Sequence, residues 1–271
     1  LHLSIRRQRQ MCIRDRSYTF GHSKSVYDGT SSVAYSNWKY SYAVDSNNPG
    51  LAYSMFDIPH RVMVSVGYRT PRYAKGFMAT TVSLVYNGYV GQRYSLTMNE
   101  SYYDAEKKKT VYIDYNGDGW GGNSLLYIPT EDELQKMDFK TEEDRRKFDE
   151  WIEGDSYAKK HRGAYAMRNS NSAPWENRVD LHVAQDIFVL KDRGSKFQVT
   201  FDVTNFANML NKKWGTTYTA AYNVMPLQVI GSKKGEDGNY TNTYAYNSRN
   251  TITKNDVLSR WHAQIGIKYI F

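Results

Sequence analysis

One short stretch of the sequence has the residue types and the spacing of a calcium-binding loop. In "DYNGDG", Asp114, Asn116 and Asp118 occupy alternating positions, and Gly119 stands where a calcium loop makes its sharp turn. Three oxygen ligands could therefore converge on one ion, although the glutamate that closes an EF-hand is missing at its usual position. The alternative is a pair of Asn-Gly and Asp-Gly turns without an ion. Both interpretations are open at this point.

The other residues that could carry chemistry do not form a recognisable catalytic set. The histidines are scattered, and no two of them have the spacing of a metal-ligand pair. The sequence contains neither a Gly-x-Ser-x-Gly elbow nor a Walker loop, and no spacing of serine, histidine and aspartate favours a triad. We therefore expect no enzymatic activity, and a protease or acyltransferase carried by this chain has little support.

The elements that would position these residues are strands, because apolar and polar residues alternate in blocks of about ten. This is the length of a tilted membrane strand. The blocks include "HRVMVSVGYR", "GFMATTVSLVYNG", "NRVDLHVAQDIFV" and "KFQVTFDVTNF". Charged residues along one face would be costly in the core of a soluble sandwich, whereas a barrel places them in its lumen. In the third block the two faces consist of Val179, Leu181, Val183 and Ile187 on one side and Arg178, Asp180, His182 and Asp186 on the other.

The last block, "WHAQIGIKYIF", has bulky apolar residues at every second position. A pattern of polar-x-Gly-x-x-aromatic-x-aromatic is met by Gln264, Gly266, Tyr269 and Phe271. This pattern resembles the C-terminal signal by which the outer-membrane assembly machinery takes up β-barrels. Aromatic residues near the end of a membrane strand anchor it at the interface. We therefore expect a membrane-assembly signal here.

Composition permits a membrane barrel and excludes a transmembrane helix. The 271 residues are 40% hydrophobic and include 24 tyrosines, but no stretch approaches the ~18 apolar residues that a spanning helix requires. The tyrosines suit the aromatic girdles of a barrel. Half of the formal net charge of +8 lies in the first sixteen residues, so the remainder does not indicate nucleic-acid binding. Cys12 is the only cysteine, which excludes a disulfide framework.

The opening "LHLSIRRQRQMCIRDR" fits none of the patterns that follow it. It has no strand alternation and no apolar run of a signal peptide. Its "MCIRDR" resembles translated sequencing-adapter sequence. We expect residues 1–16 to be a non-native segment and the natural reading frame to begin further upstream. The rival interpretation is a basic arm that binds nucleic acid or lipid headgroups.

Short and long connections alternate between the blocks. "TPRYAK" (70–75) and "KDRGS" (191–195) have the composition of tight turns, whereas the segments 27–57, 91–176 and 207–256 are long. Outer-membrane barrels have short periplasmic turns at one end and long extracellular loops at the other. Loops of this length are uncommon inside compact soluble domains. The alternation therefore favours a barrel with long surface loops.

The longest of these loops is expected to carry short helices. "TEDELQKM" opens with a capping-box pattern, Thr130 with Glu133, and Thr141 with Asp144 repeats it in "TEEDRRKFDEWIEG". Gly154 is a candidate C-cap for the second helix. That helix has one apolar stripe, which favours packing on neighbouring loops over contact with a ligand. The stripe consists of Phe148, Trp151 and Ile152.

Four stretches, taken in this order, resemble the TonB-dependent receptors of the outer membrane, in particular the Oar-like branch common in Bacteroidetes-type bacteria. They are "FDIPHRVMVSVGY", "DYNGDGWGGNSLLYIP", "RNSNSAPWENRVDLHVAQDI" and "FDVTNFANMLNKKWG". The resemblance covers residues 18–271 and is specific in the combination of stretches. It implies a 22-stranded barrel that is plugged by an N-terminal domain. Such a transporter takes up a scarce, bulky ligand with energy that TonB transmits from the inner membrane.

The sequence departs from that family by omission. About six membrane strands are recognisable, whereas the smallest such barrels need about eight, and neither the plug nor the TonB-contacting segment is present. We therefore expect an all-β chain whose residues 17–271 form the C-terminal part of a larger antiparallel transmembrane barrel. This barrel would lie in the outer membrane of a Gram-negative bacterium. The partners implied are the TonB complex through the missing N-terminal region, the assembly machinery, the lipid bilayer and an unknown siderophore, oligosaccharide or peptide.

Two other classes are open. A plug-less porin or a surface adhesin barrel would share every periodic feature and differ only upstream. A secreted carbohydrate-binding β-sandwich is disfavoured by the charged second faces, the unequal connections and Phe271. The sequence indicates no ligand-binding residues, no cofactor apart from calcium and no nucleic-acid partner.

Overall fold

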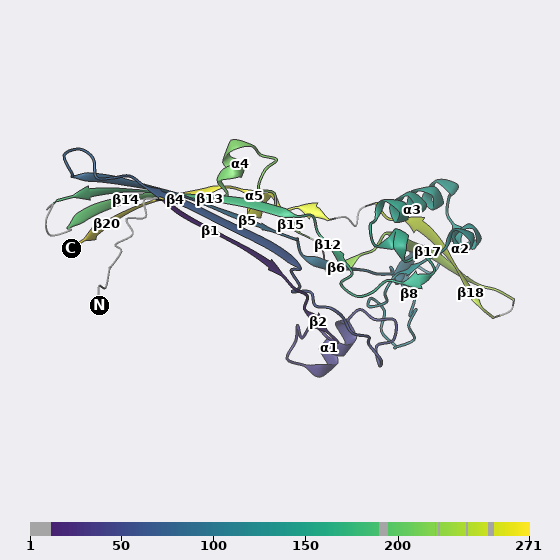
Figure 1. Cartoon of the computed structure of the whole chain (residues 1–271). Coiled ribbons are helices and arrows are strands. Elements are labelled where there is room, and N and C mark those ends of the chain that lie inside the picture. The colour runs from purple at the N-terminus through teal and green to yellow at the C-terminus, as the bar shows by residue number, and fades with distance from the viewer. Residues whose placement is uncertain (1–11, 190–194, 220, 222, 237, 249–251) are drawn as a thin grey trace.

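The protein is mostly β, with 45% of it in strands and 15% in helices. The computed structural model describes residues 12–189, 195–219, 221, 223–236, 238–248 and 252–271. A long antiparallel sheet extends to one side, and a smaller assembly of helices and short strands lies beyond one end of it (Figure 1). None of the helices in the described residues is long and apolar enough to cross a membrane.

The long sheet has six strands, the number of long strands that the sequence predicts. Their order is β1-β4-β5-β13-β14-β20, and every neighbouring pair is antiparallel. The described residues do not close this sheet into a barrel, and β1 and β20 are its two edges. The strands are β1 (Cys12–Phe20), β4 (His60–Arg69), β5 (Met78–Tyr89), β13 (Glu176–Phe188), β14 (Lys196–Thr204) and β20 (His262–Ile270).

The strand register gathers apolar residues on one face of the sheet and polar residues on the other. Side chains alternate between the two faces of a strand, so paired residues share a face. This confirms the predicted two-sided strands. An apolar row consists of Val66, Leu84, Leu181, Val203 and Ala263. The adjacent polar row consists of Gly67, Ser83, His182, Asp202 and Gln264.

Strand β1 includes residues 12–16, although their sequence shows no alternation. Strand pairing uses backbone groups that every residue except proline provides, so it does not require an alternating pattern. The side chains do not fit the rest of the sheet: Arg14 pairs with Val66 and Arg16 with Val64, which places two cations on the apolar face. On the lipid face of a barrel each would cost about 2–4 kcal/mol at the membrane midplane. The non-native origin of residues 1–16 stays a prediction, and residues 1–11 lie outside the described part.

The short connection between β4 and β5 forms a tight turn, as predicted. The Tyr73 N–H donates to the Met78 carbonyl at 2.8 Å, and Met78 donates back to Tyr73 at 3.1 Å. Three consecutive residues have left-handed backbone conformations, with φ angles of 53°, 59° and 88° at Ala74, Lys75 and Gly76. Glycine adopts this conformation readily, and the other two residues at some cost.

The second predicted turn, 191–195, falls largely outside the described residues, since the structure does not describe 191–194. On its flanks the Val189 N–H donates to the Ser195 carbonyl at 2.9 Å. The end of β20 lies at this same end of the sheet, because Ile270 pairs with Lys196. Both short connections and the end of β20 therefore share one end, and the long connections lie toward the other.

The three long connections run over 21–59, 90–175 and 205–261, where the sequence analysis places loops at 27–57, 91–176 and 207–256. The first two and part of the third fold together into one assembly, here called the cap (Figure 1). The first contributes β2 (Lys24–Ser25), α1 (Ala34–Tyr40) and β3 (Ala52–Tyr53). The second contributes β6 (Arg93–Leu96), β7 (Ser101–Asp104), β8 (Lys109–Tyr112), β9 (Tyr127–Ile128), α2 (Glu131–Lys136), β10 (Asp138–Phe139), α3 (Glu142–Gly154), a 3-10 turn (Ala158–Lys160), β11 (Ala164–Tyr165) and β12 (Asn171–Ser172). The third contains α4 (Phe206–Leu210), β15 (Tyr218–Thr219), β16 (Asn223–Val224), β17 (Leu227–Lys234), β18 (Tyr240–Tyr246), β19 (Thr253–Lys254) and α5 (Asp256–Ser259).

The buried hydrophobic cluster of the described chain lies in the cap, whereas the buried apolar residues of the long sheet, such as Ala184 and Val203, are outside this cluster. Phe148 and Ile152 of α3 are fully buried there, as the predicted apolar stripe requires, and Trp151 is half-buried beside them. The rest of this core consists of Tyr94, Leu96, Leu126, Ile128, Leu134, Ala158, Ala166, Ala173, Val224 and Leu227. The segments that the sequence predicts to be long loops therefore fold, for the most part, into one unit with its own core.

The helix caps agree with the sequence in two cases and differ in one. Thr130 Oγ1 accepts from the Glu133 N–H at 3.3 Å, and Glu133 Oε2 accepts from the Thr130 N–H at 2.9 Å, which confirms the capping box of α2. Thr141 caps α3 through the Asp144 N–H at 3.1 Å. Helix α3 ends at Gly154, as predicted, but its C-cap is the extended Asp155 and not Gly154. The Asp155 carboxylate instead accepts from the first amides of the 3-10 turn.

A candidate ligand pocket in the cap

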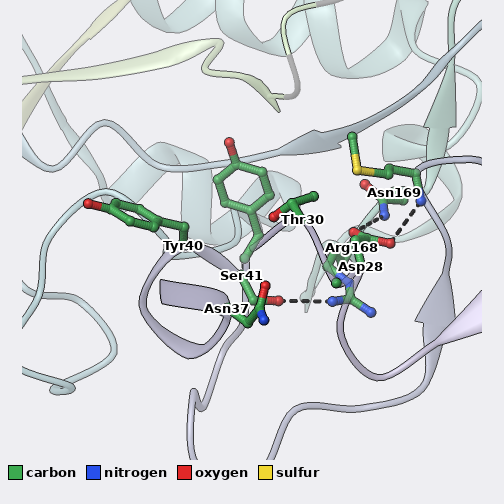
Figure 2. Close-up of a pocket in the computed structure, with 10 residues that line it drawn as sticks. Asp28, Thr30, Asn37, Tyr40, Ser41, Arg168 and Asn169 are labelled. Atoms are coloured by element: carbon green, nitrogen blue, oxygen red, sulfur yellow. Dashed lines mark hydrogen bonds between the residues drawn. The ribbon is translucent and has the colours of Figure 1, made fainter. Parts of the chain in front are cut away.

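A pocket of about 260 Å³ opens between α1, the segment after β2 and the segment before β12. Its wall combines carboxylate, amide, hydroxyl, phenol and guanidinium groups from the first long connection and from the segment before β12, which are distant in sequence (Figure 2). Such a set can hydrogen-bond a polar ligand from several directions. The labelled residues in Figure 2 are Asp28, Thr30, Asn37, Tyr40, Ser41, Arg168 and Asn169.

Asn169 fixes the inner wall of this pocket. It has a left-handed backbone conformation with φ of 55°, which asparagine tolerates better than most residues. Its side-chain amide donates to Asp28 Oδ2 at 3.0 Å and to the Tyr53 carbonyl at 2.8 Å, and its N–H donates to Ser95 Oγ at 2.9 Å. These bonds join the segments that carry Asp28, Tyr53 and Ser95 around one buried residue.

Arg168 presents a buried cation to the same pocket. Only 4% of its surface is exposed, and its guanidinium donates to Ser41 Oγ at 2.9 Å and to the Ser25 carbonyl at 2.6 Å. Burial lowers the pKa of Arg168, although the nearby charge of Asp28 acts in the opposite direction. Within the described residues, Arg168 forms no ion pair closer than 4 Å to a carboxylate. The guanidinium is therefore held by neutral groups and has donors left for a ligand oxygen.

A buried ion pair joins the first and the second long connections beside this pocket. Arg93 at the start of β6 donates to Asp57 Oδ2 from Nη2 at 2.7 Å and from Nε at 3.1 Å. Burial by itself would raise the pKa of Asp57, but the Ser23 N–H at 2.6 Å and the Arg93 guanidinium outweigh it and hold this pKa below its usual value. The guanidinium also lies over the Tyr53 ring, 4.2 Å from its centroid. This cluster holds the first long connection against the second.

Two further hollows continue from the pocket along the cap. A hollow of about 260 Å³ shares Tyr42 and Arg168 with the pocket. A third, of about 330 Å³, shares Ala43, Val44 and Tyr165 with the second and is lined by several more tyrosines. The three hollows together could accommodate an extended ligand rather than a single small molecule.

The predicted calcium loop forms a turn whose oxygens accept hydrogen bonds from the protein. The two carboxylate oxygens of Asp114 accept from the Asp118 N–H at 3.2 Å and the Gly119 N–H at 2.8 Å. Asp118 Oδ2 accepts from Ser46 Oγ at 2.6 Å and from the Asn123 amide at 2.7 Å. An ion would have to displace these donors. Within the described residues no cluster of three or more His, Cys, Asp or Glu is placed to hold a metal.

The third residue of that candidate loop, Asn116, donates from its amide to Asp118 Oδ2 at 3.2 Å and to Asn123 Oδ1 at 2.9 Å. Together with Ser46 these side chains tie the turn to the first long connection. Gly117 and Gly119 have left-handed conformations with φ of 68° and 79°, as Asn-Gly and Asp-Gly turns require. This geometry favours the interpretation of the segment as a pair of Asn-Gly and Asp-Gly turns.

Glu100, which lies beside this turn, was not singled out by the sequence. Glu100 is 4% exposed, and within the described residues neither oxygen of its carboxylate has a hydrogen-bond partner of good geometry. Burial raises the pKa of Glu100 to about 7, and the charge of Asp114 acts in the same direction. The nearby Ser124 hydroxyl and the backbone N–H groups of Asn123 and Ser124 act in the opposite direction but do not outweigh burial. A single glutamate in "MNES" has no local pattern that predicts its burial, because the residues beside it belong to the later segment 113–124.

The four residues of the predicted assembly signal lie on the edge strand β20 or just after it. Gly266 pairs with Thr200, and a Cβ atom at Gly266 would come within 2.7 Å of Thr200 Oγ1. The Tyr269 ring lies 4.9 Å from that of Phe197 and 6.1 Å from that of Phe271. The fourth residue, Gln264, pairs with Asp202 on the polar face. The structure thus groups the aromatic residues at the end of an unpaired edge, and their role in assembly stays a prediction.

Comparisons with protein-family models, with curated proteins and with solved structures find no match to this chain. The function of this chain is therefore inferred from its geometry and from its resemblance to TonB-dependent receptors. Sequence reasoning missed the cap pocket entirely. Its residues come from segments more than a hundred positions apart, such as Ser41 and Arg168, and no local pattern links them.

Proposed function

We propose that this chain forms part of the barrel wall of a TonB-dependent outer-membrane receptor and transporter, near its C-terminus. The cap would lie outside the cell, and its pocket would contribute to binding of the transported ligand. The partners would be the lipid bilayer, the assembly machinery and, through a segment outside this chain, the TonB complex. No enzymatic activity is part of this proposal.

The observation that carries the proposal is the uncovered apolar face of the long sheet. Leu84 and Phe201 are each 40% exposed there, and Ile265 and Ile267 are 71% and 77% exposed. Soluble monomers rarely expose apolar patches larger than a few hundred Å². A bilayer would cover this face, and the opposite, charged face would line a hydrated or plugged lumen.

The dimensions of β20 support a membrane position. Trp261 precedes the strand and Phe271 follows it, and between them the apolar face carries Ala263, Ile265 and Ile267 before the aromatic Tyr269. Ten residues at ~3.3 Å each span about 33 Å along the strand, which is about 25 Å across the membrane at a tilt of about 40°. This matches the apolar band of outer-membrane barrels, with aromatic residues at both boundaries.

The transport function itself rests on the resemblance to TonB-dependent receptors. The cap supports it, because three adjoining hollows with a buried cation at one end suit a bulky polar ligand better than a small ion. A porin would need a free passage and no folded ligand site. An adhesin would have the same sheet and a cap of similar kind, so the test must separate transport from binding.

The test uses the natural gene, expressed in its own host. The transporter proposal predicts that the protein sediments with the outer membrane and migrates faster on a gel when it is not heated, as folded barrels do. Deletion of the host TonB protein should abolish growth on the transported ligand while leaving the amount of the protein in the membrane unchanged. A protein that stays in the soluble fraction and shows no heat-dependent shift would refute the membrane proposal. Growth that is independent of TonB would favour the porin or adhesin.

A further inference from the structure

We infer that the cap pocket binds an acidic oligosaccharide and that the Arg168 guanidinium holds the carboxylate of one uronic-acid unit. This inference rests on the proposed function and deepens it, because it names the chemical class of the transported ligand. It also assigns Arg168 a role in specificity, since this residue would separate acidic sugars from neutral ones.

Arg168 is a buried cation whose hydrogen-bond partners are uncharged. It is 4% exposed, and within the described residues its guanidinium donates to the Ser41 hydroxyl and the Ser25 carbonyl (Figure 2). A guanidinium has five N–H donors, so others are left for a ligand. A buried charge is costly unless a partner compensates it. A ligand carboxylate would supply that partner and match the planar fork of the guanidinium.

The charges around Arg168 favour a ligand group with a single negative charge. Asp28 also lines the pocket, and its charge acts on Arg168 although the two form no ion pair within 4 Å. The oxygens of Asp28 instead accept from the Met55 N–H at 2.9 Å and from the Asn169 amide at 3.0 Å. The second negative charge of a phosphate would be repelled by this carboxylate. A carboxylate brings only the one charge that the guanidinium can compensate.

The rest of the pocket wall suits hydroxyl groups better than a peptide backbone. Thr30, Asn37 and Asp28 line it with oxygen acceptors, and the hydroxyl and amide groups among them also donate. Sugar hydroxyls both donate and accept, so they can use such a wall from several sides. An extended peptide is typically bound along an open strand edge. None of the described residues that line this pocket lies in a strand.

Exposed aromatic rings and a second cation lie at the mouth of the pocket. Tyr40 lines the pocket and is 61% exposed, and its ring is perpendicular to that of Trp120 at a centroid distance of 6.1 Å. Lys39 Nζ lies 3.3 Å from the Trp120 ring centroid and 5.4 Å from that of Tyr40. An aromatic ring can pack against the apolar C–H face of a sugar. The charge of Lys39 would attract an anionic ligand to this mouth.

The adjoining hollows provide room for further sugar units. Arg168 and Tyr42 line both the pocket and the second hollow, so a ligand that spans the two would contact Arg168. The third hollow continues from the second and offers the rings of Tyr127 and Tyr165, whose centroids are 5.1 Å apart. The ligand would therefore be a chain of several units with an acidic unit at Arg168.

The experiment measures glycan binding by the full-length natural protein, purified from its membrane in a mild detergent. A glycan array with neutral and uronate-containing oligosaccharides identifies the uronate glycan that binds most tightly. Calorimetric titration then compares this glycan with its methyl ester, which has nearly the same shape and no charge. We expect the ester to bind at least about tenfold more weakly.

Two variants show whether Arg168 is responsible for this difference. Arg168→Gln should lose at least about tenfold in affinity for the acidic glycan and little for the ester. The matched control is Arg146→Gln, which removes an exposed guanidinium that pairs with Glu143 and Glu150 on α3. The control should bind both glycans as the unmodified protein does. The comparison of acid and ester in the unmodified protein remains decisive if Arg168→Gln does not fold.

Three results would overturn the inference. They are the absence of binding to every uronate glycan on the array, equal affinity for the acid and the ester, and equally strong competition by tetraglutamate, which carries its charges on a peptide backbone. Failure of the proposed function would look different. Growth on the acidic glycan that is independent of TonB would contradict the transporter proposal and leave the binding result in place.

Discussion

The buried carboxylate of Glu100 makes the stability of the cap depend on pH. Its ordinary value of 4.5 is raised to about 7 in the folded protein, so the folded state holds this proton more tightly than the unfolded state. As pH rises from about 4.5, the unfolded state loses the proton first, and folding becomes less favourable until pH passes about 7. The cap is therefore most stable at the acidic end of this window.

The size of the effect follows from the shift. A change from 4.5 to about 7 corresponds to about 3 kcal/mol at ~1.36 kcal/mol per pKa unit. Glu100→Gln removes the titration and keeps the shape of the side chain. We expect this variant to lose most of the pH dependence between pH 5 and 8 and to be more stable than the unmodified protein at pH 8.

Amide hydrogen exchange in the cap measures this free energy. The N–H of Leu126, which donates to the Leu96 carbonyl inside the cap core, reports opening of the cap. The chemical exchange rate at each pH must be divided out before the comparison. The control is Glu106→Gln, which changes an exposed glutamate in the connection between β7 and β8. A cap that is equally stable at pH 5 and pH 8, or an unchanged pH dependence in Glu100→Gln, would refute the reasoning.

Three further predictions concern packing and pairing. Asp57→Asn leaves Arg93 buried without its counter-charge, so opening of the cap should become easier by about 3–5 kcal/mol, as measured by hydrogen exchange. Phe148→Ala should destabilise the cap by about 3–5 kcal/mol in the same assay because it leaves a cavity in the core, and an unchanged exchange rate would contradict this. Gly266→Ala should lower the amount of heat-modifiable protein in the outer membrane, and adding Thr200→Ala should restore it because the new Cβ atom then has room. No effect of Gly266→Ala, or no restoration, would show that this close approach is unimportant.

The long strands and their faces are readable from the sequence because their information is local. Alternation assigns Leu181 and His182 to opposite faces without knowledge of any partner strand. The caps of α2 and α3 are local in the same way, since Thr130 and Glu133 are three residues apart. Gly154 shows the limit of such reasoning, because the C-cap is the following Asp155.

The cap could not be predicted because its contacts are not local. Strand β16 pairs with β6 through Asn223 and Ser95, and the core joins residues of α3 to those of β6 and β17. Most of these strands have only two residues, which is too short for a period to be visible. The pocket and the burial of Glu100 depend on this packing, so both became visible only in the structure.

The central claim is that the apolar face of the long sheet contacts lipid, and spin labels along β20 test it most directly. Single cysteines would replace each residue from Ala263 to Lys268 in turn, with Cys12 changed to serine, in the natural protein in its membrane. We expect collisions with oxygen, which concentrates in lipid, to be highest at 263, 265 and 267, and collisions with a water-soluble nickel complex to be lowest there. High accessibility of these three positions to the nickel complex would contradict it.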